Sequence, residues 1–229
     1  MRFEHPEYRM INTIHLKLCG QTRAEDAHVA AGIGADYLGF IFYPKSPRAV
    51  TLAQYAELAP ELPPGPRRVA VLVEPTLEEL GAVMAAGFDF FQIHCAHTTS
   101  VETVRGWSAL VGAHRLWLAP KLPPGEDVPA DWLPLAGTFL LDTFHAGGFG
   151  GSGKTGDWAK FARHQQTNPQ HTWILAGGLN PENVAEAIAQ SGAFFVDVNS
   201  GVESTPGVKD HAKLKRLGEV LAAVERKAE

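Results

Sequence analysis

The fold of this chain is decided by residues 171–203, which read HTWILAGGLNPENVAEAIAQSGAFFVDVNSGVE. Two short apolar runs, at residues 171–176 and 194–198, each end in a glycine-containing turn, and the stretch between them has the spacing of an amphipathic helix. Pro181 is a favoured first-turn residue for that helix, and Asn180 stands before it as a cap. A strand, a helix and a second strand in this order predict two parallel strands joined by a crossover helix.

The same unit recurs along the rest of the chain. Strands are predicted at residues 13–19, 37–42, 68–73, 88–93, 115–119, 138–141, 171–176 and 194–198, and helices at residues 24–34, 52–59, 76–86, 100–110, 156–166 and 210–226 besides the one that opens at Pro181. Eight strands, nearly all followed by helices, favour a single α/β domain folded as a closed (β/α)8 TIM barrel, because an open doubly wound sheet typically has fewer strands. Residues 120–134 are rich in proline and break the helical period, so the helix after the fifth strand is expected to be shortened or missing.

The length and charge of the chain exclude several classes of protein. Its 229 residues fit one barrel domain at residues 13–229, preceded by a polar, irregular N-terminal arm at residues 1–12. Two cysteines are too few for a disulfide framework, the first residues do not resemble a secretory signal, and no apolar run approaches the ~20 residues of a membrane span. A formal net charge of -5 without a basic tract argues against nucleic acid or an acidic membrane as a partner. We therefore expect a cytoplasmic protein.

Working residues in such barrels gather where strands end, and the first strand ends with Lys17 and Cys19. The alternation of side chains along a strand puts both on the inner face, because Leu16 and Leu18 belong to the apolar outer set. A lone cysteine is most often a small buried hydrophobic group. A neighbouring ammonium would lower the pKa of the thiol, which leaves a reactive thiolate open as the alternative.

Two acidic residues stand near the ends of other strands. Asp142 closes the sixth apolar strand, where a carboxylate is either a cap for the following loop or an acid or base in a cleft. Asp197 lies inside the eighth strand, and its parity makes it the expected ion-pair partner of Lys17. We count Asp197 among the candidate substrate-binding residues as well.

Glycine-containing turns after the last two strands predict an anion site. Gly177 and Gly178 follow the seventh strand, and Ser200 and Gly201 follow the eighth. Backbone amides can approach an anion closely at glycine, and barrels of this type often bind phosphate between these two loops. The expected partner is therefore a small phosphorylated molecule.

Two other motifs point to different chemistry. Residues 148–155, GFGGSGKT, satisfy the P-loop pattern of nucleotide-binding proteins. A P-loop follows its strand directly, whereas residues 142–147 intervene here, so a mobile glycine-rich loop over an active site is favoured. His94, Cys95 and His97 invite a metal site, but their spacing fits no standard zinc pattern, and His94 is expected to contact substrate instead.

Several longer motifs resemble one known family over nearly the whole chain from Leu16 onward. They are KLCGQT at residues 17–22, GADYLGFIF at 34–42, KSPR at 45–48, QIH at 92–94, LDT at 141–143, GGSGKT at 150–155 with Asp157 and Trp158, LAGGLNPEN at 175–183 and VDVNSGVE at 196–203. Because these motifs are long and occur in the right order, the chain resembles the phosphoribosylanthranilate isomerases.

The resemblance implies an Amadori rearrangement in tryptophan biosynthesis, in which N-(5-phosphoribosyl)anthranilate becomes 1-(2-carboxyphenylamino)-1-deoxyribulose 5-phosphate. It implies Asp142 as the general acid at the furanose ring oxygen and Cys19, as thiolate, as the general base at sugar C2. Arg48 would hold the anthranilate carboxylate with its planar fork. The residues that would cradle the phosphate are Gly177, Gly178, Ser200 and Gly201. No metal or organic cofactor would be needed, and a monomer or a homodimer is expected.

The chain departs from the family pattern at two strands. Cys95 stands where the family usually has glycine, and the fifth strand lacks the usual lysine-bearing pattern, with Lys121 as the nearest substitute. Two rival functions remain open at this point, namely another phosphosugar isomerase or epimerase barrel, and a nucleotide-binding module that uses residues 148–155. A related histidine-pathway isomerase would be expected to have aspartate in place of Cys19.

Overall fold

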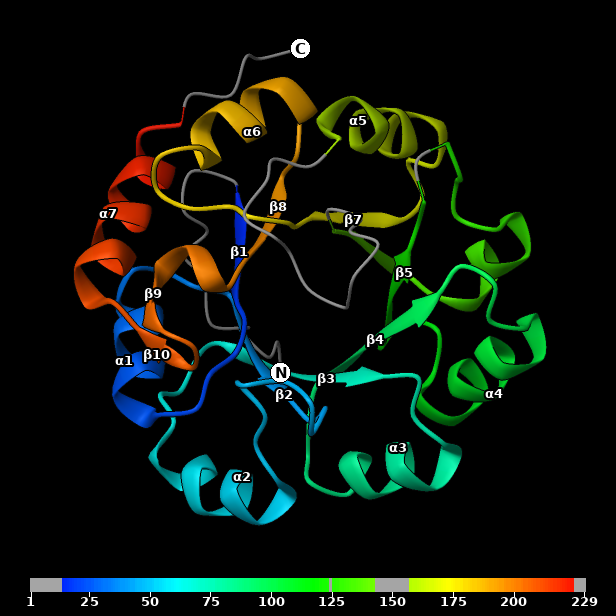
Figure 1. The fold of residues 1–229 in the computed structure, drawn as a ribbon, viewed down its shortest axis with the longest axis horizontal. Helices are drawn as coiled ribbons and strands as arrows, with labels where there is room; N and C mark the ends of the chain where they lie inside the picture. The colour runs from blue at the N-terminus through cyan, green and yellow to red at the C-terminus, as the bar shows by residue number, and fades with distance from the viewer. Residues whose placement is uncertain (1–13, 124, 143–156, 225–229) are drawn as a thin grey trace, which may run out of the picture.

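The computed structural model describes residues 14–123, 125–142 and 157–224. In these residues eight parallel strands close into one barrel in sequential order, and helices surround it (Figure 1). The barrel strands are β1 (His15–Leu18), β2 (Tyr37–Ile41), β3 (Arg67–Val73), β4 (Phe90–Ala96), β5 (Leu116–Lys121), β6 (Thr138–Leu141), β7 (Thr172–Leu175) and β8 (Phe195–Val198). The predicted (β/α)8 barrel is therefore confirmed. The N-terminal arm predicted at residues 1–12 and the glycine-rich segment at 148–155 lie outside the described residues.

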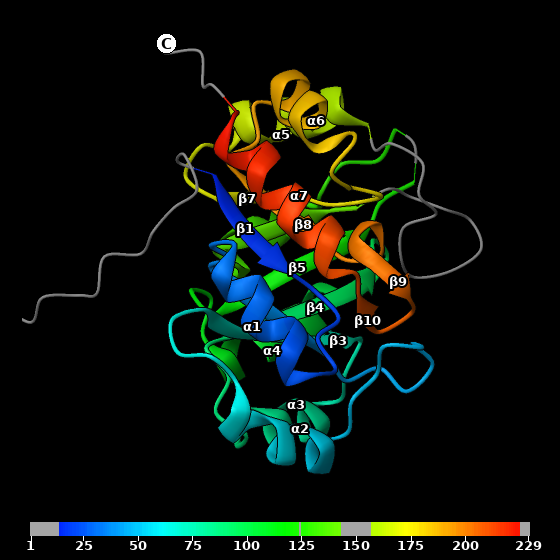
Figure 2. The same cartoon turned by 90° about the vertical axis from the view of Figure 1, so that its left-hand side faces the viewer.

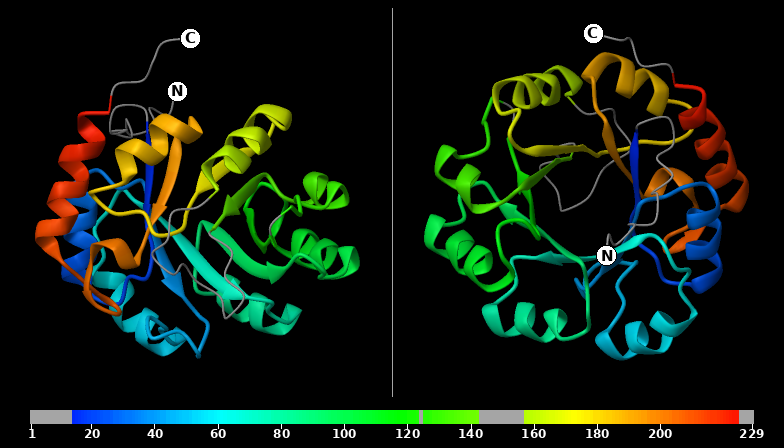
Figure 3. Two further views of the ribbon diagram at one scale, coloured as in Figure 1. Left: turned by 45° about the horizontal axis from the view of Figure 1, so that its top comes forward. Right: turned by 180° about the vertical axis from the view of Figure 1, so that it is seen from behind.

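The helices lie outside the ring of strands in every view (Figures 1 and 3). They are α1 (Ala24–Gly32), α2 (Leu52–Leu58), α3 (Leu77–Met84), α4 (Val101–Val111), α5 (Trp158–Thr167), α6 (Val184–Ser191) and α7 (His211–Ala222), with 3-10 turns η1 (Ala59–Glu61), η2 (Ala130–Leu135) and η3 (Ser200–Val202). A short antiparallel hairpin, β9 (Glu203–Thr205) and β10 (Val208–Lys209), follows β8 and lies at the end of the barrel toward which β1 points (Figure 2). None of the described helices has the length and apolar character of a membrane span.

The connection between β5 and β6 lacks an α-helix, as the proline content predicts. The 3-10 turn η2 takes its place, with Pro134 inside it. Trp132 in this turn is fully buried and belongs to the hydrophobic core outside the strands. A buried aromatic side chain of this size contributes a large apolar area to the core.

Local capping signals place several helix starts. Thr76 caps α3 as predicted, in a capping box where its side chain accepts from the amide of Glu79 and the Glu79 carboxylate accepts from the amide of Thr76. The helix predicted to open at Pro181 instead begins at Val184. Asn180 still caps the turn before it, because its Oδ1 accepts from the amides of Glu182 and Asn183.

The fourth strand was predicted at residues 88–93, and this was wrong at both ends. Strand β4 runs from Phe90 to Ala96, because its pairing with β5 continues until Ala96 lies opposite Lys121. His94 consequently lies within the strand instead of after it. Strand β5 likewise continues through Pro120 to Lys121, beyond the predicted end at Ala119.

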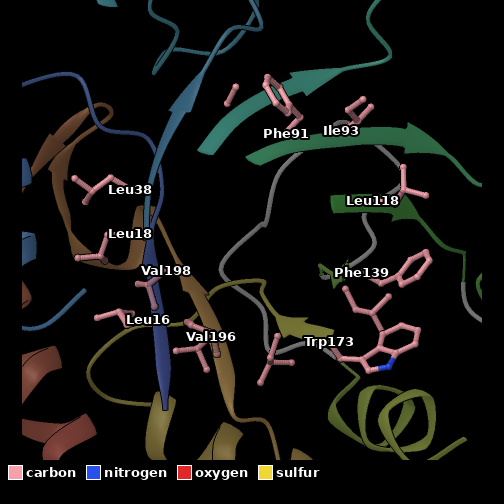
Figure 4. Packing of buried hydrophobic residues seen from close by; sticks show 14 of the residues in the cluster. Leu16, Leu18, Leu38, Phe91, Ile93, Leu118, Phe139, Trp173, Val196 and Val198 are labelled. Atoms are coloured by element: carbon pink, nitrogen blue, oxygen red, sulfur yellow. The ribbon is translucent and has the colours of Figure 1, made fainter. Parts of the chain in front are cut away.

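The core has two layers, one on each face of the strands. Leu16, Leu18, Val196 and Val198 lie on the outer face with the helices (Figure 4), and each is fully buried or nearly so. Burying a side chain of this kind stabilises the fold by ~1.5–3 kcal/mol. The inner layer includes Cys19 and closes at the amino-terminal end of the strands with Tyr37, Phe90, Trp117 and Phe195, whose rings are in contact. Among the described residues, these rings fill the barrel at the amino-terminal ends of the strands.

Candidate active site

A pocket of about 260 Å³ opens at the carboxyl ends of the strands. Every candidate site residue from the sequence lines it except Gly201. Its wall contains Cys19 after β1, Arg48 after β2, Gln92 and His94 from β4, Asp142 after β6, Gly177 and Gly178 after β7, Asp197 from β8, and Asn199 and Ser200 after β8. The thiol, the carboxylates, the guanidinium and the glycine turns therefore share one cavity, as expected for a barrel of this type.

Lys17 and Asp197 form an ion pair inside the barrel. The Lys17 Nζ lies 2.9 Å from Asp197 Oδ1, and the two residues stand opposite each other where β1 pairs with β8. The Lys17 side chain is completely buried. Burial lowers the pKa of Lys17, but Asp197 and Cys19 raise it, so that it lies above its ordinary value. The lysine is therefore charged, and the ion pair expected from strand parity is present.

Cys19 is buried at the base of the pocket, where opposing effects act on its thiol. Burial raises the pKa of Cys19, the ammonium of Lys17 lowers it, and Asp197 raises it again. The net result is a pKa above the ordinary value. Lys17 therefore acts on the thiol in the expected direction, but burial outweighs it, because a thiolate removed from water loses its solvation.

Gly39 in β2 makes room for both of these side chains. A Cβ at this position would lie 3.0 Å from Cys19 Sγ and 3.1 Å from Lys17 Nζ. Sequence reasoning did not single out this residue. The available signal was a glycine inside an apolar strand, which often marks the close approach of another group.

His94 and Gln92 point into the pocket from β4. The Gln92 side-chain amide lies 2.8 Å from His94 Nε2, so the two side chains are hydrogen-bonded to each other. Burial, with a smaller effect of Lys17, lowers the pKa of His94 to about 4. His94 is therefore a neutral imidazole at neutral pH that offers one N–H.

Cys95 takes no part in the pocket. It belongs to the outer core layer and is fully buried, which raises the pKa of its thiol. His94 and Cys95 thus lie on opposite faces of β4. Among the described residues, no three His, Cys, Asp or Glu side chains are grouped as a metal ion would require.

Gln92 was missed by sequence reasoning, although it stood within one of the family motifs. Its Oε1 is buried and accepts no hydrogen bond from the described residues. The signal was its inward parity, since Phe90, Gln92 and His94 alternate along one face of β4.

Arg48 reaches the pocket from the β2–α2 loop, but part of its guanidinium is already occupied. Its Nε lies 2.9 and 3.0 Å from the two carboxylate oxygens of Glu203, and its Nη2 lies 2.7 Å from Glu203 Oε2. Sequence reasoning placed Arg48 at a substrate carboxylate and gave Glu203 no role. The pairing joins residues far apart in the chain, and no local pattern predicts it.

The glycine turns after β7 and β8 pack directly on each other. Gly177 and Gly178 both have positive φ, of 98° and 65°. A Cβ on Gly201 would overlap the carbonyl oxygen of Leu179, so only glycine allows the β8 loop to approach the β7 loop this closely. Gly201 therefore lies behind the pocket wall, where it fixes the spacing of the two loops.

Comparisons with known proteins agree on one family. The sequence profile described as N-(5'phosphoribosyl)anthranilate (PRA) isomerase matches residues 16–220. The chain is 40% identical over 209 residues to the N-(5'-phosphoribosyl)anthranilate isomerase of Pseudomonas fluorescens (strain Pf0-1), covering 90% of this chain and 97% of that protein.

Solved structures give the same result. A phosphoribosyl anthranilate isomerase in complex with reduced 1-(o-carboxyphenylamino)-1-deoxyribulose 5-phosphate is similar with a TM-score of 0.71 and 31% identity, covering 91% of this chain and 98% of that one. A structure described as monomers of the dimeric enzyme from Thermotoga maritima is similar with a TM-score of 0.72 and 30% identity, covering 92% of this chain and 99% of that one.

Proposed function

This chain belongs to the phosphoribosylanthranilate isomerase family, and on that premise we propose how its own residues divide the reaction. The enzyme catalyses the Amadori rearrangement of N-(5-phosphoribosyl)anthranilate to 1-(2-carboxyphenylamino)-1-deoxyribulose 5-phosphate in tryptophan biosynthesis. The reaction opens a furanose ring and moves a proton away from sugar C2. It therefore needs an acid and a base near the same sugar.

Asp142 is the general acid. Its proton passes to the furanose ring oxygen while the bond between that oxygen and C1 breaks, and the nitrogen lone pair forms the C1=N double bond. A carboxyl group is suited to this role when it stands at the mouth of a cleft from which water is largely excluded. Asp142 follows the buried strand β6 and lines the pocket.

Cys19 is the general base. Its thiolate takes the proton from C2, and the electrons of the C–H bond form C1=C2 as the C1=N electrons return to nitrogen. Ketonisation then gives the 2-keto product. The Lys17 ammonium lowers the pKa of Cys19 against the effect of burial, so it is the group that stabilises the reactive thiolate.

The remaining pocket residues hold the substrate. The backbone at Gly177, Gly178 and Ser200 receives the phosphate, with Gly201 supporting the loop from behind. Arg48 holds the anthranilate carboxylate through the guanidinium edge that Glu203 leaves free. Asp197 faces the sugar hydroxyls as an acceptor, and His94 faces them as a neutral hydrogen-bonding group.

We expect the chain to work in the cytoplasm as a monomer or a homodimer. The relative from Thermotoga maritima is described as dimeric and also as monomers. Light scattering during gel filtration decides between the two forms for this chain.

The observation that carries the proposal is that Cys19 and Asp142 line one pocket together with the glycine turns. The test follows turnover by the loss of anthranilate-ribotide fluorescence with freshly generated substrate. Cys19→Ala and Asp142→Ala each abolish turnover and still bind a phosphorylated ligand. Cys95→Ala is the matched control, because it removes the other thiol from the far face of β4 and keeps activity. Retained turnover in either site variant would refute the assigned role.

A further inference from the structure

A buried network of charged groups stands behind the wall of the pocket. Glu203, the first residue of β9, lies between two cations, Arg48 from the β2–α2 loop and Lys209 at the end of β10. The Lys209 Nζ lies 3.1 Å from Glu203 Oε1, and the side chains of Glu203 and Lys209 are 5% and 0% exposed. The β9–β10 hairpin (Figure 2) thus carries both Glu203, which pairs with Arg48, and Lys209, which pairs with Glu203.

Lys209 is held as an ammonium by three acceptors. Besides Glu203 Oε1, its Nζ contacts the backbone oxygen of Asn199 at 3.2 Å and Asn199 Oδ1 at 2.9 Å. An ammonium has three donors and no acceptor capacity, so these contacts match its protonated form. Burial lowers the pKa of Lys209 below its ordinary value, and the Glu203 carboxylate acts against that shift.

The carboxylate of Glu203 uses one edge of the Arg48 guanidinium. The contacts engage Nε and Nη2, which form the side edge of the planar group. A guanidinium has five N–H donors in a fixed fork, so the edge formed by Nη1 and the second hydrogen of Nη2 stays available. Arg48 is among the residues that line the pocket, whereas Glu203 and Lys209 are not.

A bidentate pair fixes the plane of a guanidinium as well as its position. An arginine without such a partner samples many rotamers. Ordering its side chain when the ligand binds would cost entropy and lower the affinity. The positive charge of the guanidinium favours an anion at its free edge. The arrangement therefore prepares Arg48 for a planar, two-oxygen acceptor before any ligand binds.

We propose that Glu203, itself held by Lys209, is a positioning residue that aims Arg48 at the carboxylate of the arylamine and so sets the preference for a carboxylated aryl ring over an unsubstituted one. The inference rests on the proposed contact between Arg48 and the anthranilate carboxylate. Glu203 touches no reacting atom in this account. It acts through Arg48.

The test compares two reduced product analogues that differ only in the carboxylate. One is reduced 1-(o-carboxyphenylamino)-1-deoxyribulose 5-phosphate, and the other is its phenylamino counterpart. Glu203→Gln keeps the size of the side chain and removes its charge. By calorimetry it binds the carboxylated analogue about 10-fold more weakly or worse, as expected for the loss of a charge-assisted hydrogen bond. It binds the phenylamino analogue within about 2-fold of the wild type, and KM rises while kcat stays within about 3-fold.

Two results overturn the inference. One is unchanged affinity for the carboxylated analogue, and the other is an equal loss for both analogues, which would indicate a merely structural role. Glu219→Gln, at an exposed position of α7, is the matched control and changes neither affinity. If Glu203→Gln does not fold, Lys209→Gln takes its place, and it must show the same selective loss for the inference to stand.

Arg48→Ala separates this inference from the proposed function on which it rests. Selective loss of the carboxylated analogue in both Arg48→Ala and Glu203→Gln supports the two together. Selective loss in Arg48→Ala alone leaves the carboxylate contact standing and rejects the positioning role of Glu203. No selective loss in Arg48→Ala rejects the carboxylate contact itself.

Discussion

The ammonium of Lys17 lies 2.9 Å from Asp197 Oδ1 in the interior of the barrel, beneath the pocket. This pair places a positive charge beside a thiol that burial would otherwise keep protonated. The balance between burial and the Lys17 charge therefore controls how readily Cys19 becomes a base.

Removing the Lys17 charge should make Cys19 harder to deprotonate. Because the ammonium lowers the thiol pKa, Lys17→Met raises it further, and the low-pH limb of kcat/KM moves to higher pH. The pH dependence of kcat/KM and the ultraviolet absorbance of the thiolate in a Cys95→Ala background both measure this shift. A limb that stays in place or moves to lower pH would contradict the role given to Lys17.

Lys17→Met also leaves the Asp197 carboxylate without its partner and costs stability, by less than the ~3–5 kcal/mol of a fully buried pair because Asp197 lines the pocket. The double variant Lys17→Met/Asp197→Asn is the control, because it removes both charges. It recovers stability in urea unfolding, while burial still keeps the pKa of Cys19 above its ordinary value.

Asp26 should make stability depend on pH. Burial raises its pKa, but Arg23, the amide of Lys209 and His211 lower it, and the net pKa lies below the ordinary value of 3.8. Its stabilising contribution is therefore complete above that ordinary pKa and is lost as the pH falls through the lower folded-state pKa.

The measurement for Asp26 is the free energy of unfolding in urea at a series of acidic pH values. Asp26→Asn loses ~1.5–3 kcal/mol at neutral pH, the usual range for a hydrogen bond to a charged group. The difference from the wild type shrinks at the acid end. A difference that is constant across the series would show that the carboxylate charge is not the cause.

Gly201→Ala should weaken phosphate binding. The added Cβ would overlap the carbonyl oxygen of Leu179, so the two glycine turns must separate. The inhibition constant for inorganic phosphate then rises about 10-fold or more, which corresponds to ~1.4 kcal/mol.

Gly81→Ala serves as the control for that substitution. It lies in α3, where an added Cβ meets nothing within 4 Å. Replacing a mid-helix glycine by alanine stabilises a helix by ~0.5–1 kcal/mol and leaves phosphate inhibition unchanged. Equal phosphate affinity in Gly201→Ala and the wild type would mean that loop spacing does not matter for the anion.

Much of this architecture follows from local sequence patterns. Apolar runs that alternate with helical stretches predict all eight strands. The prolines around Trp132 predict that no α-helix follows β5. Strand parity alone places Lys17 opposite Asp197. The end of β4 was not predictable in the same way, because His94 is polar and the strand continues only through its pairing with β5.

The electrostatics of the site were harder to predict, because groups far apart in the sequence act on the same side chains. Parity brings Lys17 and Cys19 together. The direction in which the thiol pKa shifts depends on burial, which only the folded structure determines. The pairing of Arg48 with Glu203 joins a loop after β2 to the first residue of β9, and no spacing rule connects them. The P-loop pattern at residues 148–155 lies outside the described residues, and the family profile that covers this segment is that of the isomerase.

The central claim is that Asp142 opens the ring and Cys19 removes the C2 proton, and an isotope effect separates these steps. Asp142→Asn and Cys19→Ser are assayed at saturating substrate with hydrogen or deuterium at sugar C2, by loss of anthranilate-ribotide fluorescence. The account predicts that the deuterium isotope effect on kcat increases in Cys19→Ser, because proton removal becomes rate-limiting there. In Asp142→Asn the effect falls toward unity, because ring opening becomes rate-limiting instead. Equal isotope effects in the two variants, or the reverse pattern, would contradict it.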